Sequence, residues 1–195
     1  MKKIALLLFI IISSFNNNSF ADDKKIKRIY EGQADAKITI ITYESLTCGH
    51  CADFHNNVYP ELKKDFIDKG LVKIEFRHFP LDIASFNASK IAQCNNDGNS
   101  NLLHILFSNQ KKWANGETVE EINDRLKKLL KDEGINIDFK KCITDKSIED
   151  YVLNDRIEGV KKFKVNATPT IIINDKKFDK ALNYKNLKKT LEKLI

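Results

Sequence analysis

The stretch Thr-Cys-Gly-His-Cys at 47–51 decides how this chain folds. It follows an apolar run at 38–43 that is typical of a buried strand, and it opens a segment at 52–68 that is typical of a helix. Two cysteines separated by two residues at such a junction are typical of a dithiol redox site. The first N–H groups of a helix lack intrahelical partners and carry the positive end of its dipole, so they stabilise a thiolate at Cys48. We therefore predict that Cys48 is the nucleophile and that Cys51, one turn further along, is the resolving thiol.

His50 lies between the two cysteines, where it can add a positive charge or a hydrogen bond to the thiolate. Stabilising the thiolate stabilises the reduced form, which makes the disulfide a stronger oxidant. Other interpretations of the pair are weaker. A structural disulfide across so small a ring is strained, a zinc site needs a second ligand pair that the sequence lacks, and a haem attachment site needs histidine where Ala52 stands. We expect no metal and no cofactor.

The first 21 residues have the pattern of a secretory signal peptide. Lys2 and Lys3 are followed by an apolar run at 4–12 and by Ser-Phe-Ala at 19–21, which predicts a mature chain starting at Asp22. The apolar run is shorter than the roughly 20 residues of a membrane-spanning helix, so we expect no stable membrane insertion after cleavage. An uncleaved anchor is the alternative. Export would place the four cysteines in an oxidising compartment, where two disulfides can form.

The composition gives no sign of nucleic-acid binding. The formal net charge is +6 at pH 7, and a basic balance can indicate a nucleic-acid partner. Here the excess is scattered lysine without a basic stripe. We interpret it as a solvated surface.

The remaining pattern predicts an α/β chain interrupted by helices. Strands are predicted at 25–31, 38–43, 71–79, 170–173 and 177–178, with a helix at 49–68 that Pro60 should kink and a last helix that Asn183 caps. Helices are predicted throughout 81–164, with caps at Thr118, Asp138 and Ser147. Without this block, the element order is that of a thioredoxin fold with a right-handed crossover. We therefore predict a thioredoxin-like domain at 22–80 and 165–195, with an inserted helical domain at 81–164.

The chain resembles the DsbA-like thiol–disulfide oxidoreductases of the bacterial periplasm over essentially its whole mature length. The resemblance rests on the Cys-Gly-His-Cys motif at 48–51, the helical block, and Ala-Thr-Pro-Thr at 167–170 before the next strand. It implies that Pro169 is cis and packs beside Cys48. It also implies that Thr168 offers backbone hydrogen bonds to an extended substrate chain.

The chain departs from the best-known DsbA proteins at three positions. Thr168 resembles the disulfide isomerases, whereas those oxidases have valine, and Gly49 stands where the best-known DsbA has proline. Both departures leave oxidase and isomerase open. The best-known family members have a buried glutamate that tunes the dithiol at the position where this chain has Thr42. Glu44, two residues further on, would face the same side of an ideal strand. We hypothesise that Glu44 moves protons to Cys51; a solvent-facing loop glutamate is the alternative.

The other two cysteines, Cys94 and Cys142, both fall in the helical block. A structural disulfide is our first interpretation, since some relatives carry a second pair in this domain. Free buried thiols, or a redox role that tunes the active pair, are the alternatives. His55, His78 and His104 show no partner pattern, so we expect them to be surface or core residues.

These observations predict a periplasmic oxidase that introduces disulfides into reduced or unfolded exported proteins. By resemblance, a membrane partner of the DsbB type would reoxidise it. A disulfide isomerase and an exported thiol reductant are alternative enzymes. An exported binding domain on the same scaffold is the non-enzymatic alternative.

Overall fold

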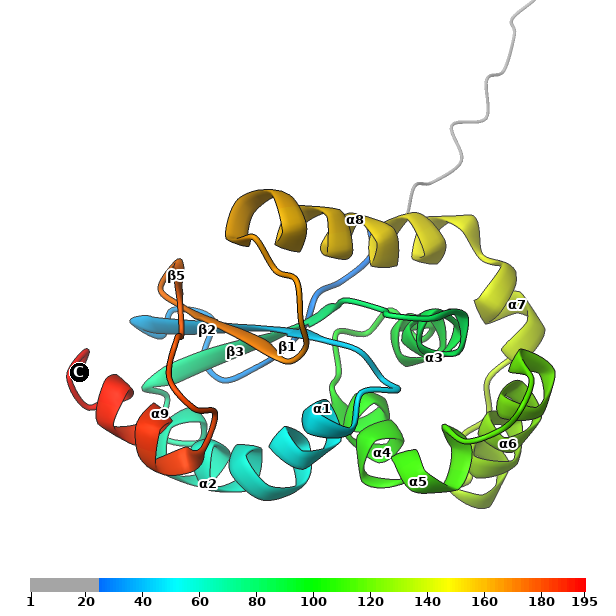
Figure 1. Cartoon of the computed structure of the whole chain (residues 1–195), viewed down its shortest axis with the longest axis horizontal. Helices are drawn as coiled ribbons and strands as arrows, with labels where there is room; N and C mark the ends of the chain where they lie inside the picture. Colours follow the sequence, from blue (N-terminus) through cyan, green and yellow to red (C-terminus); the bar gives the residue numbers. More distant parts are fainter. Residues whose placement is uncertain (1–24) are drawn as a thin grey trace, which may run out of the picture.

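The computed structural model describes residues 25–195, so the predicted signal peptide at 1–21 lies outside the described residues. Its centre is a five-stranded sheet in the order β1-β3-β2-β4-β5 (Figure 1). The strands are β1 Ile29–Glu31, β2 Ile38–Glu44, β3 Val72–His78, β4 Thr170–Ile173 and β5 Lys176–Lys177. The β2–β3 pair is parallel and the other three pairs are antiparallel. This mixed sheet, covered by helices, confirms the predicted thioredoxin fold.

The middle strand β2 is buried along almost its whole length because both faces of the sheet are covered. Ile40 lies opposite Ile74 of β3 on one side and Ile173 of β4 on the other. The apolar run that predicted this strand therefore reflects burial on both faces. The first strand is shorter than predicted, since pairing begins only at Ile29.

The helix after the dithiol is not a single kinked α-helix. It consists of α1 Gly49–Asp53, η1 Phe54–Val58, α2 Tyr59–Leu62 and η2 Lys63–Ile67, where η1 and η2 are π-helical. The Tyr59 N–H bonds to the carbonyl of Phe54, five residues back. Pro60, which has no N–H to donate, follows this wide turn directly. Pro60 thus lies in the short α2 turn, which two π-helical segments flank.

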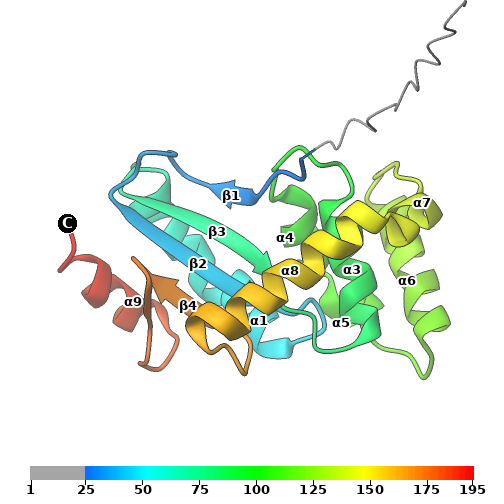
Figure 2. The same ribbon diagram turned by 90° about the horizontal axis from the view of Figure 1, so that it is seen from above.

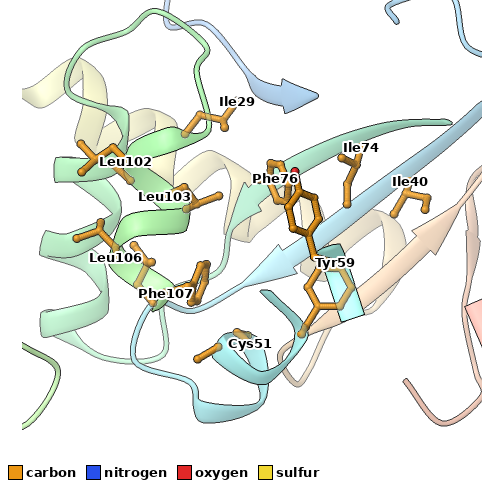
Figure 3. Packing of buried hydrophobic residues seen from close by; sticks show 14 of the residues in the cluster. Ile29, Ile40, Cys51, Tyr59, Ile74, Phe76, Leu102, Leu103, Leu106 and Phe107 are labelled. Carbon is orange, nitrogen blue, oxygen red and sulfur yellow. The ribbon is translucent and has the colours of Figure 1, made fainter. Parts of the chain in front are cut away.

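Five helices form a layer beside the sheet: α3 Ile83–Gln93, α4 Asn101–Ser108, α5 Gln110–Trp113, α6 Val119–Asp132 and α7 Phe139–Thr144. The predicted caps at Thr118 and Asp138 are confirmed, since their side chains accept from the N–H groups of Glu121 and Lys141. Leu103 and Phe107 of α4 face the sheet and the crossover helix, while Leu102 and Leu106 face the neighbouring helices (Figure 3). The layer therefore shares one apolar core with the sheet.

Helix α8, Lys146–Phe163, lies across the opposite face of the sheet (Figures 1 and 2). Its cap is Asp145, which accepts from the N–H groups of Ser147 and Ile148. The predicted cap at Ser147 was therefore wrong by two residues, because the Asp145 carboxylate accepts from both of these N–H groups. Gly159 lets α8 approach β2 closely, since a Cβ there would lie 2.7 Å from a ring carbon of Tyr43.

The C-terminal elements agree with the sequence. Asn174 and Asp175 both have positive φ, at 46° and 64°, and turn β4 into β5 as a tight hairpin. Asn183 caps α9, Tyr184–Leu191, by accepting from the Asn186 N–H. The apolar side of α9, with Leu187 and Leu191, is buried in the core. No helix within residues 25–195 has the length and apolar character needed to cross a membrane.

Candidate active site

The two cysteines of the motif occupy different surroundings at the start of α1. Cys48 is the N-cap residue, with extended backbone angles, and its carbonyl accepts from the N–H groups of Cys51 and Ala52. The Cys48 thiol is half-buried, whereas Cys51 is fully buried. Both sulfurs are free thiols in this structure. One sulfur is therefore accessible to a partner and the other is enclosed.

The surroundings of Cys48 stabilise its thiolate. A hydrogen bond with the Cys51 thiol lowers the pKa of Cys48 most; burial opposes it, and Thr168 and the N–H groups of Cys51 and His50 lower it further. The net result is a pKa of about 5. At neutral pH Cys48 is therefore a thiolate, as a nucleophilic cysteine requires.

Cys51 has the opposite character. Burial raises the pKa of its thiol most, and the hydrogen bond to Cys48 and the negative charge of Glu44 raise it further. Cys51 is therefore a thiol at neutral pH and donates to Cys48. A thiolate formed at Cys51 by opening a disulfide must take up a proton.

The loop before β4 lies against the reactive sulfur. The Thr168–Pro169 peptide bond is cis, and Cys48 Sγ lies 3.3 Å from the Thr168 carbonyl oxygen, to which it donates when it is protonated. Beside them is a cavity of about 630 Å³ that is lined by His50, Asp53, Phe54, Asn57, Val58, Thr168, Pro169 and Leu182. The structure thus brings Cys48, Thr168 and Pro169 together from opposite ends of the chain.

His50 acts on the thiolate through its backbone. Its N–H contributes to the lowered pKa of Cys48, while its side chain is 88% exposed and stands 4.0 Å from the Asp53 carboxylate. The ring therefore lies at the rim of the cavity, where an incoming chain would meet it.

Glu44 is the last residue of β2 and is only 4% exposed. The alternative that it faces solvent from a loop is therefore wrong. Its Oε2 lies 3.0 Å from Nε2 of His55, and its Oε1 has no hydrogen-bond partner among the described residues. The buried carboxyl is close enough to Cys51 for its charge to affect the thiol.

The sequence did not reveal that His55 and His104 have partners. His55 joins Glu44 to His104, which in turn contacts Glu31. One signal was present: His55 follows Cys51 by four residues, one helical turn, and so lies on the same side of the helix. His104 and Glu31 come from distant segments, and nothing in their local sequence indicates the contact.

Cys94 and Cys142 are joined in a disulfide with a Cα–Cα distance of 5.4 Å. It connects the end of α3 to α7 within the helical layer. Among residues 25–195, no group of three or more His, Cys, Asp or Glu side chains could hold a metal ion.

An accessible thiolate at a helix start, paired with a buried thiol and covered by a cis-proline loop, defines a thiol–disulfide exchange site. A family model described as thioredoxin matches residues 24–193. The crystal structure of Wolbachia pipientis alpha-DsbA1 has a TM-score of 0.77 at 30% identity, covering 86% of this chain and 90% of that chain. The oxidised BdbD of Bacillus subtilis has a TM-score of 0.67 at 25% identity, covering 86% and 92%. The chain therefore belongs to the thioredoxin family, among its DsbA-like members.

Relatives known from sequence carry consistent names. A Rickettsia bellii protein named as a protein-disulfide oxidoreductase is 31% identical in an alignment of 150 residues that covers 73% of this chain and 55% of the relative. Disulfide bond formation protein D of Bacillus subtilis is 27% identical in an alignment of 175 residues that covers 83% of this chain and 74% of the relative. The chain spans about half to three fifths of the length of the Rickettsia proteins it matches.

Proposed function

We propose that this chain oxidises the thiols of exported proteins through a disulfide between Cys48 and Cys51. A substrate thiolate attacks Cys48 Sγ, the Cys48–Cys51 bond breaks, and its electron pair goes to Cys51, which takes up a proton. A second substrate thiol loses its proton and attacks the substrate sulfur of the mixed disulfide, and Cys48 leaves as a thiolate. The substrate gains a disulfide, and the enzyme dithiol holds the two electrons.

The observation that supports an oxidase is the environment of Cys48. A cysteine with a pKa of about 5 is a good leaving group at neutral pH, and its stabilised thiolate favours the reduced enzyme. Favouring the reduced enzyme makes its disulfide a strong oxidant.

The cis-proline loop is the proposed substrate-binding element. A substrate segment in extended form would pair with the backbone of Thr168 beside Pro169, as added strands do. The cavity next to the loop would take a neighbouring substrate side chain, with His50 at its rim. Main-chain pairing with few side-chain contacts suits a protein that accepts many reduced substrates.

Return of the enzyme to its disulfide form requires an acceptor of two electrons. We assign this reoxidation to a membrane partner of the DsbB type. We also propose that the chain acts in the periplasm after removal of residues 1–21. The first assignment rests on the resemblance to DsbA-like proteins, and the second also rests on the signal-like pattern of residues 1–21.

A disulfide isomerase is the second candidate, and the observation that favours it is the residue before Pro169. Thr168 has a buried hydroxyl with no hydrogen-bond partner among the described residues, and it lies beside Cys48. The chain resembles the disulfide isomerases of this superfamily in having threonine at this position.

The deciding experiment is the equilibrium of the Cys48–Cys51 pair with a glutathione buffer, followed by oxidation of a reduced model protein. A potential of about −120 mV, as in strong dithiol oxidants, is the expected result. A potential of about −270 mV, as in thioredoxin, would contradict the oxidase proposal and indicate a reductant. Refolding of scrambled ribonuclease separates isomerase from oxidase. The Cys48→Ser variant should lose every one of these activities, whereas a binding domain would keep its function.

A further inference from the structure

A continuous line of polar side chains leads from the buried side of the dithiol toward the surface. Glu44 Oε2 lies 3.0 Å from His55 Nε2, His55 Nδ1 lies 3.0 Å from His104 Nδ1, and His104 Nε2 lies 2.7 Å from Glu31 Oε1. The four residues come from β2, η1, α4 and β1, so tertiary packing alone assembles the line.

The inner end of the line lies beside Cys51. The Glu44 charge acts on the Cys51 thiol, and the backbone of the next residue, Ser45, hydrogen-bonds to the same sulfur. One oxygen of the buried Glu44 carboxyl contacts His55, while the other has no partner among residues 25–195. That second oxygen makes no hydrogen bond with the Cys51 sulfur in this structure, so the last proton transfer requires a bridging water or a small movement of the carboxyl.

The two imidazole rings in the middle are held in place by aromatic neighbours. His55 stacks on Phe107 with ring centroids 4.0 Å apart, and His104 stacks on Tyr59 at 4.5 Å. Figure 3 shows Phe107 and Tyr59 among the packed side chains around the crossover helix. The side chain of His55 is 2% exposed, so its polar contacts are those of the line itself. Fixed rings keep donor and acceptor nitrogens aligned from one turnover to the next.

The outer end is polar and open to solvent. Burial disfavours the charge of Glu31, but hydrogen bonds from His104, Lys63 and Ser100 outweigh it and hold its pKa well below the ordinary value. A cavity of about 400 Å³ reaches both histidines; its lining includes Tyr59, Lys63, Lys64 and Asp68. Glu31 itself lines another cavity, of about 1120 Å³, where water can exchange protons with the outer end of the line.

We propose that Glu44, His55, His104 and Glu31 form a proton relay between Cys51 and solvent, an inference that rests on the proposed thiol–disulfide exchange. Each of the three contacts joins two atoms that both carry lone pairs, so each contact needs one proton. An imidazole can accept a proton at one nitrogen while releasing another from the other nitrogen. When each proton crosses its own contact, one proton moves in effect between Glu31 and Glu44. Because the pKa of Glu31 is held well below the ordinary value, Glu31 carries the proton only transiently and exchanges it with solvent.

The reaction needs such a path because Cys51 is enclosed. When a substrate thiolate attacks Cys48, the disulfide breaks and Cys51 leaves with the electron pair. Glu44 then gives a proton to the Cys51 sulfur. A proton from solvent moves inward through the relay and replaces it. During reoxidation by a partner disulfide, Cys51 returns the proton to Glu44 before attacking Cys48. The two half-reactions use the relay in opposite directions, so the histidine tautomers reversed in one are restored in the other.

Several other titratable groups face the relay and bear on its pH dependence. Tyr59 stacks on His104, Lys63 bridges Glu31 and Asp68, and His78 pairs across the sheet with Glu44. Burial lowers the pKa of His78 and keeps it neutral. His78 hydrogen-bonds to Gln93 and stands outside the line, so it provides a matched control.

The test follows the reduced enzyme as it reacts with oxidised glutathione, with rapid acid quench, alkylation and mass spectrometry. The Cys48 thiolate first forms a mixed disulfide with glutathione, in a step that needs no proton from Cys51. Cys51 must then lose its proton and attack, which releases reduced glutathione. General acid–base catalysis contributes roughly 100-fold or more, so His104→Ala and Glu44→Gln should slow the second step at least about 10-fold. The mixed disulfide should accumulate, with the first step unchanged.

Controls separate a relay from a structural role. Imidazole added to His104→Ala should restore the second step in proportion to its concentration, because the vacated space adjoins the existing cavity. His78→Gln should keep both steps at the rates of the unaltered chain and show no response to imidazole. If His104→Ala fails to fold, His104→Gln provides the same test, since an amide fills the space but cannot relay a proton.

Two results would overturn the relay. One is a second step that stays fast in both His104 variants; the other is a slow step that imidazole does not restore, which would give His104 a packing role only. Neither result depends on protein substrates, because glutathione is the reaction partner. Failure of the unaltered chain to oxidise a reduced protein would instead contradict the proposed function and leave the relay measurement valid.

Discussion

Cys48 Sγ lies 3.3 Å from the carbonyl oxygen of Thr168, although 120 residues separate the two in sequence. The contact places the reactive sulfur against the loop proposed to bind substrate. The same loop residue also tunes the sulfur, because Thr168 contributes to the lowered pKa of Cys48. Substrate binding and thiolate stabilisation are therefore coupled through one residue.

Replacement of Thr168 by valine tests this coupling. Valine keeps the shape and backbone of Thr168 but removes the hydroxyl. The Thr168 hydroxyl has no hydrogen-bond partner among the described residues while Cys48 is a thiol, but it lies beside the sulfur and can donate to the thiolate. A hydrogen bond to a charged group contributes about 1.5 kcal/mol or more, so without the hydroxyl the pKa of Cys48 should rise by about 1 unit. The disulfide should become less oxidising by about 30 mV. Thiolate absorbance against pH and glutathione equilibration measure the two effects. Thr144→Val, at an exposed position on α7, should change neither value. An unaltered Cys48 pKa in Thr168→Val would show that the hydroxyl does not stabilise the thiolate.

The lowered pKa of Cys48 also predicts how stability depends on pH. Between about pH 5 and the ordinary thiol pKa near 9, the folded reduced chain binds fewer protons at Cys48 than the unfolded chain does. Its free energy of unfolding should therefore rise with pH across this window. The gain should disappear as pH falls through about 5.

The oxidised chain provides the control, because its Cys48 does not titrate. Urea unfolding of both forms at pH 5 and pH 8 should show that the reduced form gains stability relative to the oxidised form at the higher pH. Parallel pH dependences of the two forms would contradict a stabilised thiolate.

The close approach of α8 to the sheet predicts the effect of a single methyl group. In Gly159→Ala, the new Cβ would lie 2.7 Å from a ring carbon of the buried Tyr43. Overpacking of this kind costs typically 1–3 kcal/mol. Chemical denaturation of the oxidised protein should show a loss in that range. Gly49→Ala, whose Cβ would meet nothing within 4 Å, should leave the free energy of unfolding nearly unchanged. Equal stabilities of the two variants would mean that α8 can shift away from β2.

The local sequence predicted those features that local physics decides. The dithiol at a helix start, the caps at Thr118 and Asp138 and the β4–β5 turn all depend on a few neighbouring residues. The α8 cap was misplaced because Asp145 and Ser147 are both good caps, and only the backbone geometry chooses between them. The contacts of His104 with His55 and Glu31 depend on how distant elements pack. Periodicity identifies buried faces, but it does not say which polar side chains meet inside them.

The second disulfide should stabilise the helical layer without controlling the chemistry at Cys48. Cys94 and Cys142 close a loop across a sequence separation of 48 residues. In the chain-entropy model, such a cross-link contributes roughly 4 kcal/mol at most. The double variant Cys94→Ala/Cys142→Ala should therefore unfold at lower urea concentration, with a loss of up to about 4 kcal/mol. Its Cys48 pKa should stay near 5, because no group of this pair contributes to that value. If the glutathione equilibrium of Cys48–Cys51 shifted in the double variant, the pair would have a tuning role. Unchanged stability would show that packing of α3 against α7 holds the layer without the bond.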